Sequence, residues 1–337
     1  MAEPVALVMR SPTGRALAAT ALAVVAVALW PASALGTVPS CGDVITKDTK
    51  LKKDILDCAG DGLTIAADGV TLDLGGHVID GDGDGGSGII SYGNHRVQIR
   101  NGTVRQFRIG VYLTRSLAPT VAASTLPTNH LVTKLTVVDN ANHGIHVLDG
   151  SQNVLERNRI ARNGAWGISI AGGGDNTIAR STLVGNRSGG LLLSSGTRLN
   201  STHDNLVREN EVADNEGYGI VLGGSLLAPF SIRDNQIEKN DVIGNERDGI
   251  WLAGGGGTLE GNRTDRNGDD GIDVDCRYRA DAPPDARTCL PETTLRRNAA
   301  NRNGDLGIEA DPGITDGGRN TGTGNGTPAE CVGVTCS

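Results

Sequence analysis

The sequence predicts an all-β fold, a right-handed parallel β-helix of roughly nine to ten coils, and two observations predict it. The first is a repeat of the form Asn-x-x-x-Gly-[Ile/Leu], which begins at Asn140, Asn163, Asn186, Asn215, Asn245, Asn267 and Asn303. Its spacing indicates a coil of about 22 residues that carries insertions, as in a solenoid. The second is apolar–polar alternation of period two, as in Ile168-Ser169-Ile170, which is typical of strands.

Further polar residues mark the corners between the short strands. Most repeats carry a second Asn (Ser181 in one coil) five residues before the first, and several carry a third five residues earlier. Asn tolerates the left-handed backbone of a sharp corner. Stacked at roughly 4.8 Å, its amide can also bond the amide one coil away, which predicts Asn ladders. A leucine-rich-repeat horseshoe is the structural alternative, but the sequence lacks the Leu-x-x-Leu-x-Leu pattern.

Residues 1–36 resemble an export signal. Arg10 and Arg15 precede an uncharged run from Ala16 to Trp30, and small residues follow it. A retained membrane anchor is the alternative, although the run is shorter than the roughly 20 residues of a membrane span. We therefore expect a secreted or extracytoplasmic monomer without membrane contact after cleavage, with a single domain at 37–337. Its N-terminal cap would be 37–60 and its disulfide-closed tail 314–337.

The net charge excludes one class of partner. Losing Glu3, Arg10 and Arg15 with the signal removes one net positive charge and takes the chain from −8 to −9. Nucleic acid requires a basic surface, so we expect no nucleic-acid partner.

The six cysteines fall into three neighbouring pairs, all in the exported part: Cys41 with Cys58, Cys276 with Cys289, and Cys331 with Cys336. An even count in an exported chain favours disulfides over metal binding, and no Cys-x-x-Cys spacing supports zinc. Proximity alone ranks these pairs first among fifteen connectivities.

Both ends of the repeat region resemble a known group. Residues 41–81, from Cys-Gly-Asp-Val-Ile-Thr to Gly-Gly-His-Val-Ile-Asp-Gly, are similar to the opening of secreted β-helix proteins of the pectin-lyase-like superfamily. The segment from Asp316-Gly317-Gly318 to Cys336 resembles their closing segment, so the resemblance covers residues 40–337. It implies the fold but leaves the activity open, because the superfamily includes lyases, hydrolases, epimerases and proteins of no assigned role.

Register predicts which side chains share one outer face. If the Ile or Leu after each Gly points inward, the next residue points outward and stacks on its equivalents. This column is Tyr112, His146, Ser169, Leu192, Val221, Trp251, Asp273 and Glu309.

A carboxylate cluster ends this face, and its members are the catalytic candidates Asp273, Asp275, Glu309 and Asp311. Stacked carboxylates would lie about 5 Å apart, as in glycosidases, and their repulsion would raise at least one pKa. Together with Asp270 they are also oxygen ligands suited to Ca²⁺, the one cofactor we consider. The third interpretation is a solvated acidic surface. Asp269–Asp273 is similar to the polygalacturonase Asp-Asp motif, but the Gly-His-Gly and Arg-Ile-Lys motifs of that family are absent.

Two further groups of side chains lie on the same face. Tyr112, His143 and His146 could exchange a sugar C5 proton, as in uronate lyases and epimerases, or be ordinary polar surface. The rings of Trp166, Tyr218 and Trp251 could bind sugars or lie beneath inserted loops.

These features predict an exported β-helix that binds polysaccharide, as a lyase, hydrolase or epimerase. Whether it is an enzyme stays open, because a non-catalytic binding rod in the cell envelope fits the same repeat. A β-helical copper-processing accessory is a third alternative. The arginines beside the Asn corners are interpreted as a mixed, solvated edge rather than a track for a polyanion.

Overall fold

The computed structural model describes residues 38–83, 85–115, 126–196, 201–223, 232–253, 256–275 and 293–337. The predicted export signal and the Cys276–Cys289 pair lie outside the described residues. Val38–Ser337 forms one compact unit.

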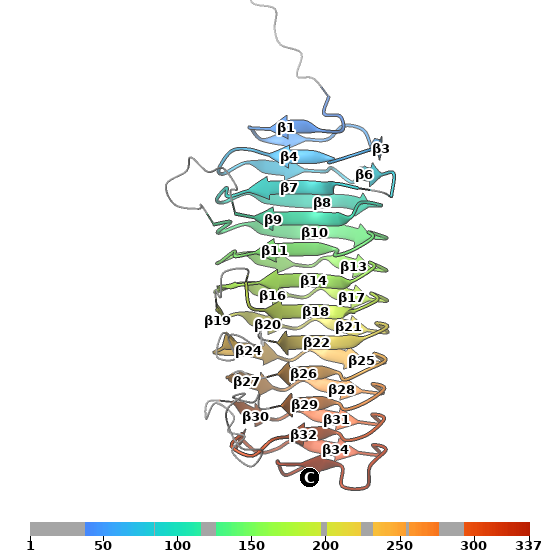
Figure 1. The fold of residues 1–337 in the computed structure, drawn as a ribbon, viewed down its shortest axis with the longest axis vertical. Helices are drawn as coiled ribbons and strands as arrows, with labels where there is room; N and C mark the ends of the chain where they lie inside the picture. Colours follow the sequence, from blue (N-terminus) through green and yellow to red (C-terminus); the bar gives the residue numbers. More distant parts are fainter. Residues whose placement is uncertain are drawn as a thin grey trace, which may run out of the picture. The chain divides into compact units, whose positions relative to one another are not determined.

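Three faces of parallel strands wind around a common core (Figure 1). The first face is a twelve-stranded sheet in the described part of the chain. In spatial order it contains β1 (Asp43–Ile45), β4 (Leu63–Ile65), β7 (Ser87–Tyr92), β9 (Ile109–Thr114), β11 (Ile145–Leu148), β14 (Trp166–Ala171), β18 (Gly189–Ser194), β22 (Tyr218–Gly223), β26 (Ile250–Ala253), β29 (Ile272–Asp275), β32 (Ile308–Ala310) and β35 (Cys331–Val332).

The other two faces share the long strands β8 (Gln98–Arg105) and β10 (Leu131–Val138). The second face adds β2 (Thr49–Lys50), β5 (Thr71–Asp73), β12 (Val154–Glu156), β16 (Thr177–Ala179), β20 (Leu206–Arg208), β24 (Asn235–Glu238), β27 (Gly257–Glu260), β30 (Thr294–Arg296) and β33 (Thr315–Asp316). The third adds β3 (Ile55–Cys58), β6 (Val78–Gly81), β13 (Arg159–Ala161), β17 (Thr182–Val184), β21 (Glu211–Ala213), β25 (Asp241–Ile243), β28 (Arg263–Asp265), β31 (Ala299–Asn301) and β34 (Thr321–Thr323). A small sheet of β15 (Gly173–Gly174), β19 (Thr202–His203) and β23 (Ile232–Arg233) accompanies them.

The predicted all-β solenoid is confirmed, but twelve strands in the first face exceed the nine to ten coils expected. The Asn-x-x-x-Gly motif marks only seven coils, because those of β1, β4, β7, β9 and β35 lack it.

Inward aliphatic side chains form the core. Ile145, Ile168 and Leu191 stand opposite one another on the first face, and each is at most 1% exposed. The column continues through Ile220, Ile250, Ile272 and Ile308. Burying one such side chain contributes about 1.5–3 kcal/mol, so this column stabilises every coil that it crosses.

The predicted Asn ladders form. The Asn215 side chain is fully buried, and its Nδ2 donates to Asn245 Oδ1 at 2.8 Å and to the Leu183 carbonyl at 3.2 Å. Its Oδ1 accepts from the backbone N–H and the side-chain Nδ2 of Asn186. Each ladder residue thus connects three coils.

The prediction that the corner Asn adopts the left-handed backbone is wrong. This backbone belongs to the residue before the ladder Asn, as at Arg162 (φ 53°), Asp214 (φ 51°) and Arg302 (φ 56°). The Asn points its amide inward between the coils. The preceding residue therefore makes the turn, and its side chain stays in solvent.

Two of the predicted disulfides lie in the described residues, and both are formed. Cys41–Cys58 and Cys331–Cys336 close the two ends, with Cα–Cα distances of 5.4 and 6.0 Å. Across the described residues there is no helix of the length and hydrophobicity that a membrane span needs.

Candidate functional site

The outward column of the first face has the predicted register. His146 pairs with Tyr112 and Ser169, and Trp251 pairs with Val221 and Asp273. Glu309 pairs with Asp273 at the far end. The middle of the column is more buried than expected, since Ser169 and Val221 are 2% and 3% exposed.

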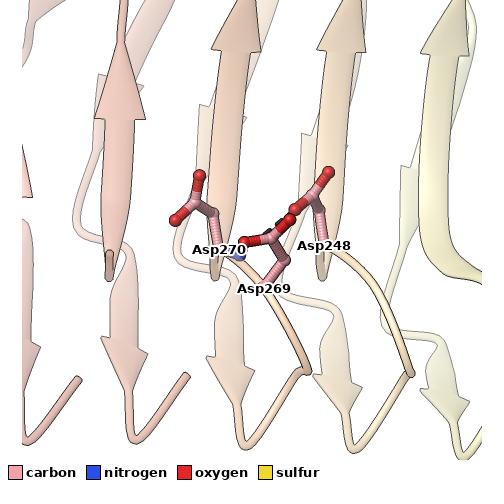
Figure 2. Close-up of side chains that lie close together, drawn as sticks. All are labelled: Asp248, Asp269 and Asp270. Carbon is pink, nitrogen blue, oxygen red and sulfur yellow. Dashed lines mark hydrogen bonds between the residues drawn. The ribbon is translucent and has the colours of Figure 1, made fainter. Parts of the chain in front are cut away.

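At the acidic end of this face, two further carboxyl groups come from residues that precede the strands. Asp248 and Asp270 precede the glycines that lead into β26 and β29, and Figure 2 shows their carboxyl groups beside that of Asp269. The Asp270 N–H donates to Asp248 Oδ1 at 3.1 Å, and the Leu306 N–H donates to Asp270 Oδ1 at 2.7 Å. Backbone bonds between coils therefore fix the positions of both carboxyl groups.

Two overlapping groups of carboxylate oxygens have the spacing that a cation would need. Oxygens of Asp248, Asp269 and Asp270 lie within 4.8 Å of one another, and so do oxygens of Asp270, Asp273 and Glu309. The described residues place neither Asp275 nor Asp311 in these groups. Asp311 follows β32, where its N–H donates to the Val274 carbonyl.

Burial changes the acidity of this cluster more than charge repulsion does. Burial first, and the neighbouring carboxylates second, raise the pKa of Asp273 to about 8. Burial also raises the pKa of Asp270 to about 7 and that of Asp248 to about 6. The sequence predicted raised values from repulsion and an exposed patch of Asp273, Asp275, Glu309 and Asp311. Asp275 and Glu309 are exposed, whereas Asp273 and Asp311 are half-buried.

Sequence reasoning left Asp248 and Asp269 out of the site. Asp248 occupies the same position before Gly as Asp270, one coil earlier, so the column that contains Asp270 could have identified it. Asp269 is exposed and joins the group through the turn before β29.

An aromatic pair adjoins the carboxyl groups. The rings of Tyr218 and Trp251 stack with centroids 5.2 Å apart and planes at 17°. The Trp251 indole N–H donates to Asp275 Oδ2 at 3.2 Å. Arg247 lies over the Tyr218 ring, 5.3 Å from its centroid, and donates to the Tyr218 hydroxyl. Trp166 stands apart from this pair and lies against Gly189.

The second predicted group also comes together. His146 stacks on Tyr112 and on His143, with ring centroids 5.3 and 5.0 Å apart. Burial first, then the neighbouring His143, lowers the pKa of His146 to about 4, so the imidazole is neutral at pH 7. Its Nδ1 is buried and has no hydrogen-bond partner in the described part of the chain.

Solved structures share this fold at low sequence identity. The periplasmic alginate epimerase AlgG is 16% identical with a TM-score of 0.59, over 87% of this chain and 73% of that one. The A-module of the mannuronan C-5 epimerase AlgE4 of Azotobacter vinelandii is 16% identical with a TM-score of 0.54, over 88% and 90%. The Dettilon tailspike protein gp208 is 18% identical with a TM-score of 0.54, over 88% and 59%. At these identities the likeness shows the fold alone.

Sequence comparison identifies the family. No curated protein matches the chain. The family model "Right handed beta helix region" matches residues 52–200, 87–256 and 194–326, which together span most of the chain. The chain belongs to this right-handed β-helix family.

Proposed function

We propose that the protein is an exported enzyme that hydrolyses a polysaccharide at an aromatic–acidic site, which consists of Tyr218, Trp251, Asp270, Asp273 and Glu309. The observation that carries the proposal is their register. Trp251 of β26, Asp273 of β29 and Glu309 of β32 are direct neighbours on three successive coils. A sugar-stacking ring and a carboxyl pair are thus held on one rigid sheet.

The carboxyl pair has the properties that glycoside hydrolysis requires. Asp273, with a pKa of about 8, is protonated at neutral pH and can donate its proton to the glycosidic oxygen. The exposed Glu309 carboxylate can attack the anomeric carbon as the bond to the leaving sugar breaks. Water, deprotonated by Asp273, then releases the sugar from Glu309. Asp273 and Glu309 have oxygens within 4.8 Å of each other, which is too close for the roughly 6.5–9.5 Å carboxyl separation of inverting enzymes, so we expect retention of anomeric configuration.

The aromatic pair would orient the glycan. Sugar rings present apolar CH faces, and a partly exposed indole opposite Asp273 can hold one of them beside the acid. The two terminal disulfides suit an oxidising, extracytoplasmic compartment. The fold is shared with an alginate epimerase and a mannuronan C-5 epimerase, which also favours a polysaccharide substrate.

The Tyr112–His146 pair supports a second candidate activity, transfer of a sugar C5 proton. The observation that favours it is the buried, unpartnered Nδ1 of a neutral imidazole stacked on a phenol ring. A hydrolase and a lyase both form new reducing ends, a lyase alone also forms unsaturated sugars, and an epimerase forms neither.

The test is a panel of neutral, amino and uronate glycans incubated with wild type and variants, with reducing ends, absorbance of unsaturated sugars and the NMR signals of C5 epimers as readouts. Asp273→Asn should abolish new reducing ends, and Asp57→Asn is the matched control because Asp57 is exposed on β3. Unsaturated or epimerised products that are lost in Tyr112→Phe would favour the second activity. No turnover of any glycan would refute both and leave a binding rod.

A further inference from the structure

The first face carries a stretch without charge beside its acidic end. β14, β18, β22 and β26 follow one another in this sheet (Figure 1), and none of their residues is charged. This aromatic stretch, as we call the four strands, presents outward side chains such as Trp166, Leu192 and Ala171, all of them partly exposed. A ligand that binds over it must therefore present apolar surface.

The three rings of the aromatic stretch all reach the next coil toward the C-terminus. The Trp166 ring lies over Gly189 of β18, where a Cβ atom would meet two ring atoms at 2.4 and 2.9 Å. The Tyr218 ring of β22 stacks on Trp251 of β26, and the Trp251 indole N–H donates to Asp275 of β29. The rings thus extend from β14 to the strand that carries the proposed acid.

Gly189 makes room for the ring that lies farthest from the carboxyl pair. Trp166, Gly189 and Tyr218 are direct neighbours on three successive coils. Because Gly189 has no side chain, the Trp166 ring fills the space between its own coil and that of Tyr218. The row of rings therefore continues across β18, although this strand has no aromatic residue of its own.

Trp166 also keeps a hydrogen-bond donor available. Its indole N–H has no acceptor among the described residues and is open to solvent. In contrast, Asp275 accepts the Trp251 N–H, and Arg247 donates to the Tyr218 hydroxyl. A sugar stacks its apolar CH face on an indole, and its hydroxyl groups accept hydrogen bonds. Trp166 offers both kinds of contact at one place.

The spacing of the coils gives the length of such a ligand. Parallel strands repeat at about 4.8 Å, which is close to the length of one pyranose unit in an extended glycan. The step from one strand to the next occurs four times between β14 and β29, so this part of the face spans roughly four sugar units. Beyond β32 the described sheet has only β35. A glycan along the face thus contacts more units on one side of the carboxyl pair than on the other.

We infer that the aromatic stretch is an extended binding site for an unbranched glycan, with Trp166 as its distal sugar-binding residue. Successive pyranose units stack on the three rings, and the carboxyl pair of Asp273 and Glu309 cleaves the chain near one end of the bound segment. The inference rests on the proposed function, because it assigns the length and direction of the ligand at that same site.

The test measures affinity against chain length. The probes are trimers and hexamers of β-1,4-linked glucose, of β-1,4-linked N-acetylglucosamine and of galacturonate, titrated into Asp273→Asn so that they stay intact. Tryptophan fluorescence is the readout, because a sugar that stacks on an indole changes its emission. We expect at least one hexamer to bind about tenfold more tightly than its trimer. Part of its emission change should be missing in Trp166→Phe, which assigns that part to the Trp166 indole.

Variants locate the distal contact. Trp166→Ala should weaken hexamer binding about tenfold and leave trimer binding unchanged, because Tyr218 and Trp251 alone can hold a trimer. Trp166→Phe keeps a ring over Gly189 and should retain most of the hexamer affinity. Tyr92→Ala is the matched control, since Tyr92 of β7 is 40% exposed on the same face but lies beyond β14 as seen from the carboxyl pair. It should leave both affinities unchanged.

Cleavage by the wild type is the second readout, and it separates the inference from the proposed function. A hexamer that is cleaved should give mainly fragments of unequal length. Cleavage into equal halves, equal affinity for trimer and hexamer, or unchanged hexamer binding in Trp166→Ala would overturn the inference and leave the hydrolase standing. Length-dependent binding that is lost in Trp166→Ala, without any cleavage, would support the inference and contradict the hydrolase. If no hexamer binds, the extended site is refuted.

Discussion

Replacing Asn215 by leucine tests how the coils are held together. The substitution removes the two hydrogen bonds that Nδ2 donates and the two that Oδ1 accepts, at a position with no exposed side-chain surface. At a net contribution of about 0.5–1.5 kcal/mol each, these bonds stabilise the fold by about 2–6 kcal/mol. Single substitutions seldom exceed 4–5 kcal/mol, so we expect a loss of about 3 kcal/mol.

The assay is thermal unfolding followed by circular dichroism. An unfolding entropy of about 2.1 cal/mol/K per residue, over about 300 residues, converts 3 kcal/mol into a Tm lower by about 5 °C. Asn240→Ser is the graded control. Ser181 occupies the equivalent position two ladder steps away, where its Oγ accepts the Asn158 N–H at 3.2 Å and donates to the Ala179 carbonyl at 3.0 Å. Equal Tm values for wild type and Asn215→Leu, or a larger loss in Asn240→Ser, would refute the ladder's role.

The remaining predictions concern charge, metal and disulfide. Asp273 has a pKa of about 8 in the folded chain against an ordinary value of 3.8, so the folded chain holds this proton more tightly and its contribution to stability falls as pH rises from about 4 to 8. Asp273→Asn should remove that part of the fall in Tm, and an unchanged pH profile of Tm would contradict the raised pKa. If the carboxyl groups of Asp270, Asp273 and Glu309 hold a cation instead of acting in hydrolysis, millimolar Ca²⁺ should raise the calorimetric Tm relative to EDTA, and Asp270→Asn/Asp273→Asn should abolish the rise; no Ca²⁺ effect on wild type would eliminate the metal. Non-reducing peptide mapping should show a Cys276–Cys289 disulfide, which we expect to stabilise the fold by roughly 3 kcal/mol. A disulfide from either residue to another cysteine would refute the local pairing. Burial lowers the pKa of His130 to about 4 in the folded chain, so stability is lost as pH falls from 6.5 to 4. His130→Asn should therefore raise the Tm at pH 4 more than at pH 7. An equal change in Tm at both pH values would argue against a neutral buried imidazole.

The sequence predicted the stacking of equivalent residues because a β-helix repeats its register at every coil. Trp251, Asp273 and Glu309 could therefore be placed beside one another from the spacing of the Gly-Ile motifs alone. The backbone of the corner could not be read in the same way. Asn is the residue that repeats, yet the turn is made by variable neighbours such as Arg162 and Asp214, whose identity gives no conformational signal.

The alternation of apolar and polar residues could not predict how deeply an outward side chain is buried. Alternation says that Asp270 and Ser169 point away from the core, but adjacent coils and side chains still cover both almost completely. The raised pKa of Asp270 follows from that cover, because burial is its largest cause. Asp248 occupies the same position as Asp270 one coil earlier, but its depth, 7% exposed, is equally invisible to the pattern.

The two buried acidic positions indicate how this fold can carry a charged site. Asp265 belongs to β28 on the third face, where arginines from its own and the neighbouring coil neutralise it. Asp248 and Asp270 lie at the entrance to the first face, where backbone N–H groups fix one oxygen of each and no arginine of the described residues pairs with them. Burying these carboxyl groups without a cation costs stability, and the Asn ladders and the aliphatic column that run through the same coils offset that cost. The scaffold can therefore carry buried carboxyl groups with raised pKa values on its first face, because the residues that hold the coils together are other residues.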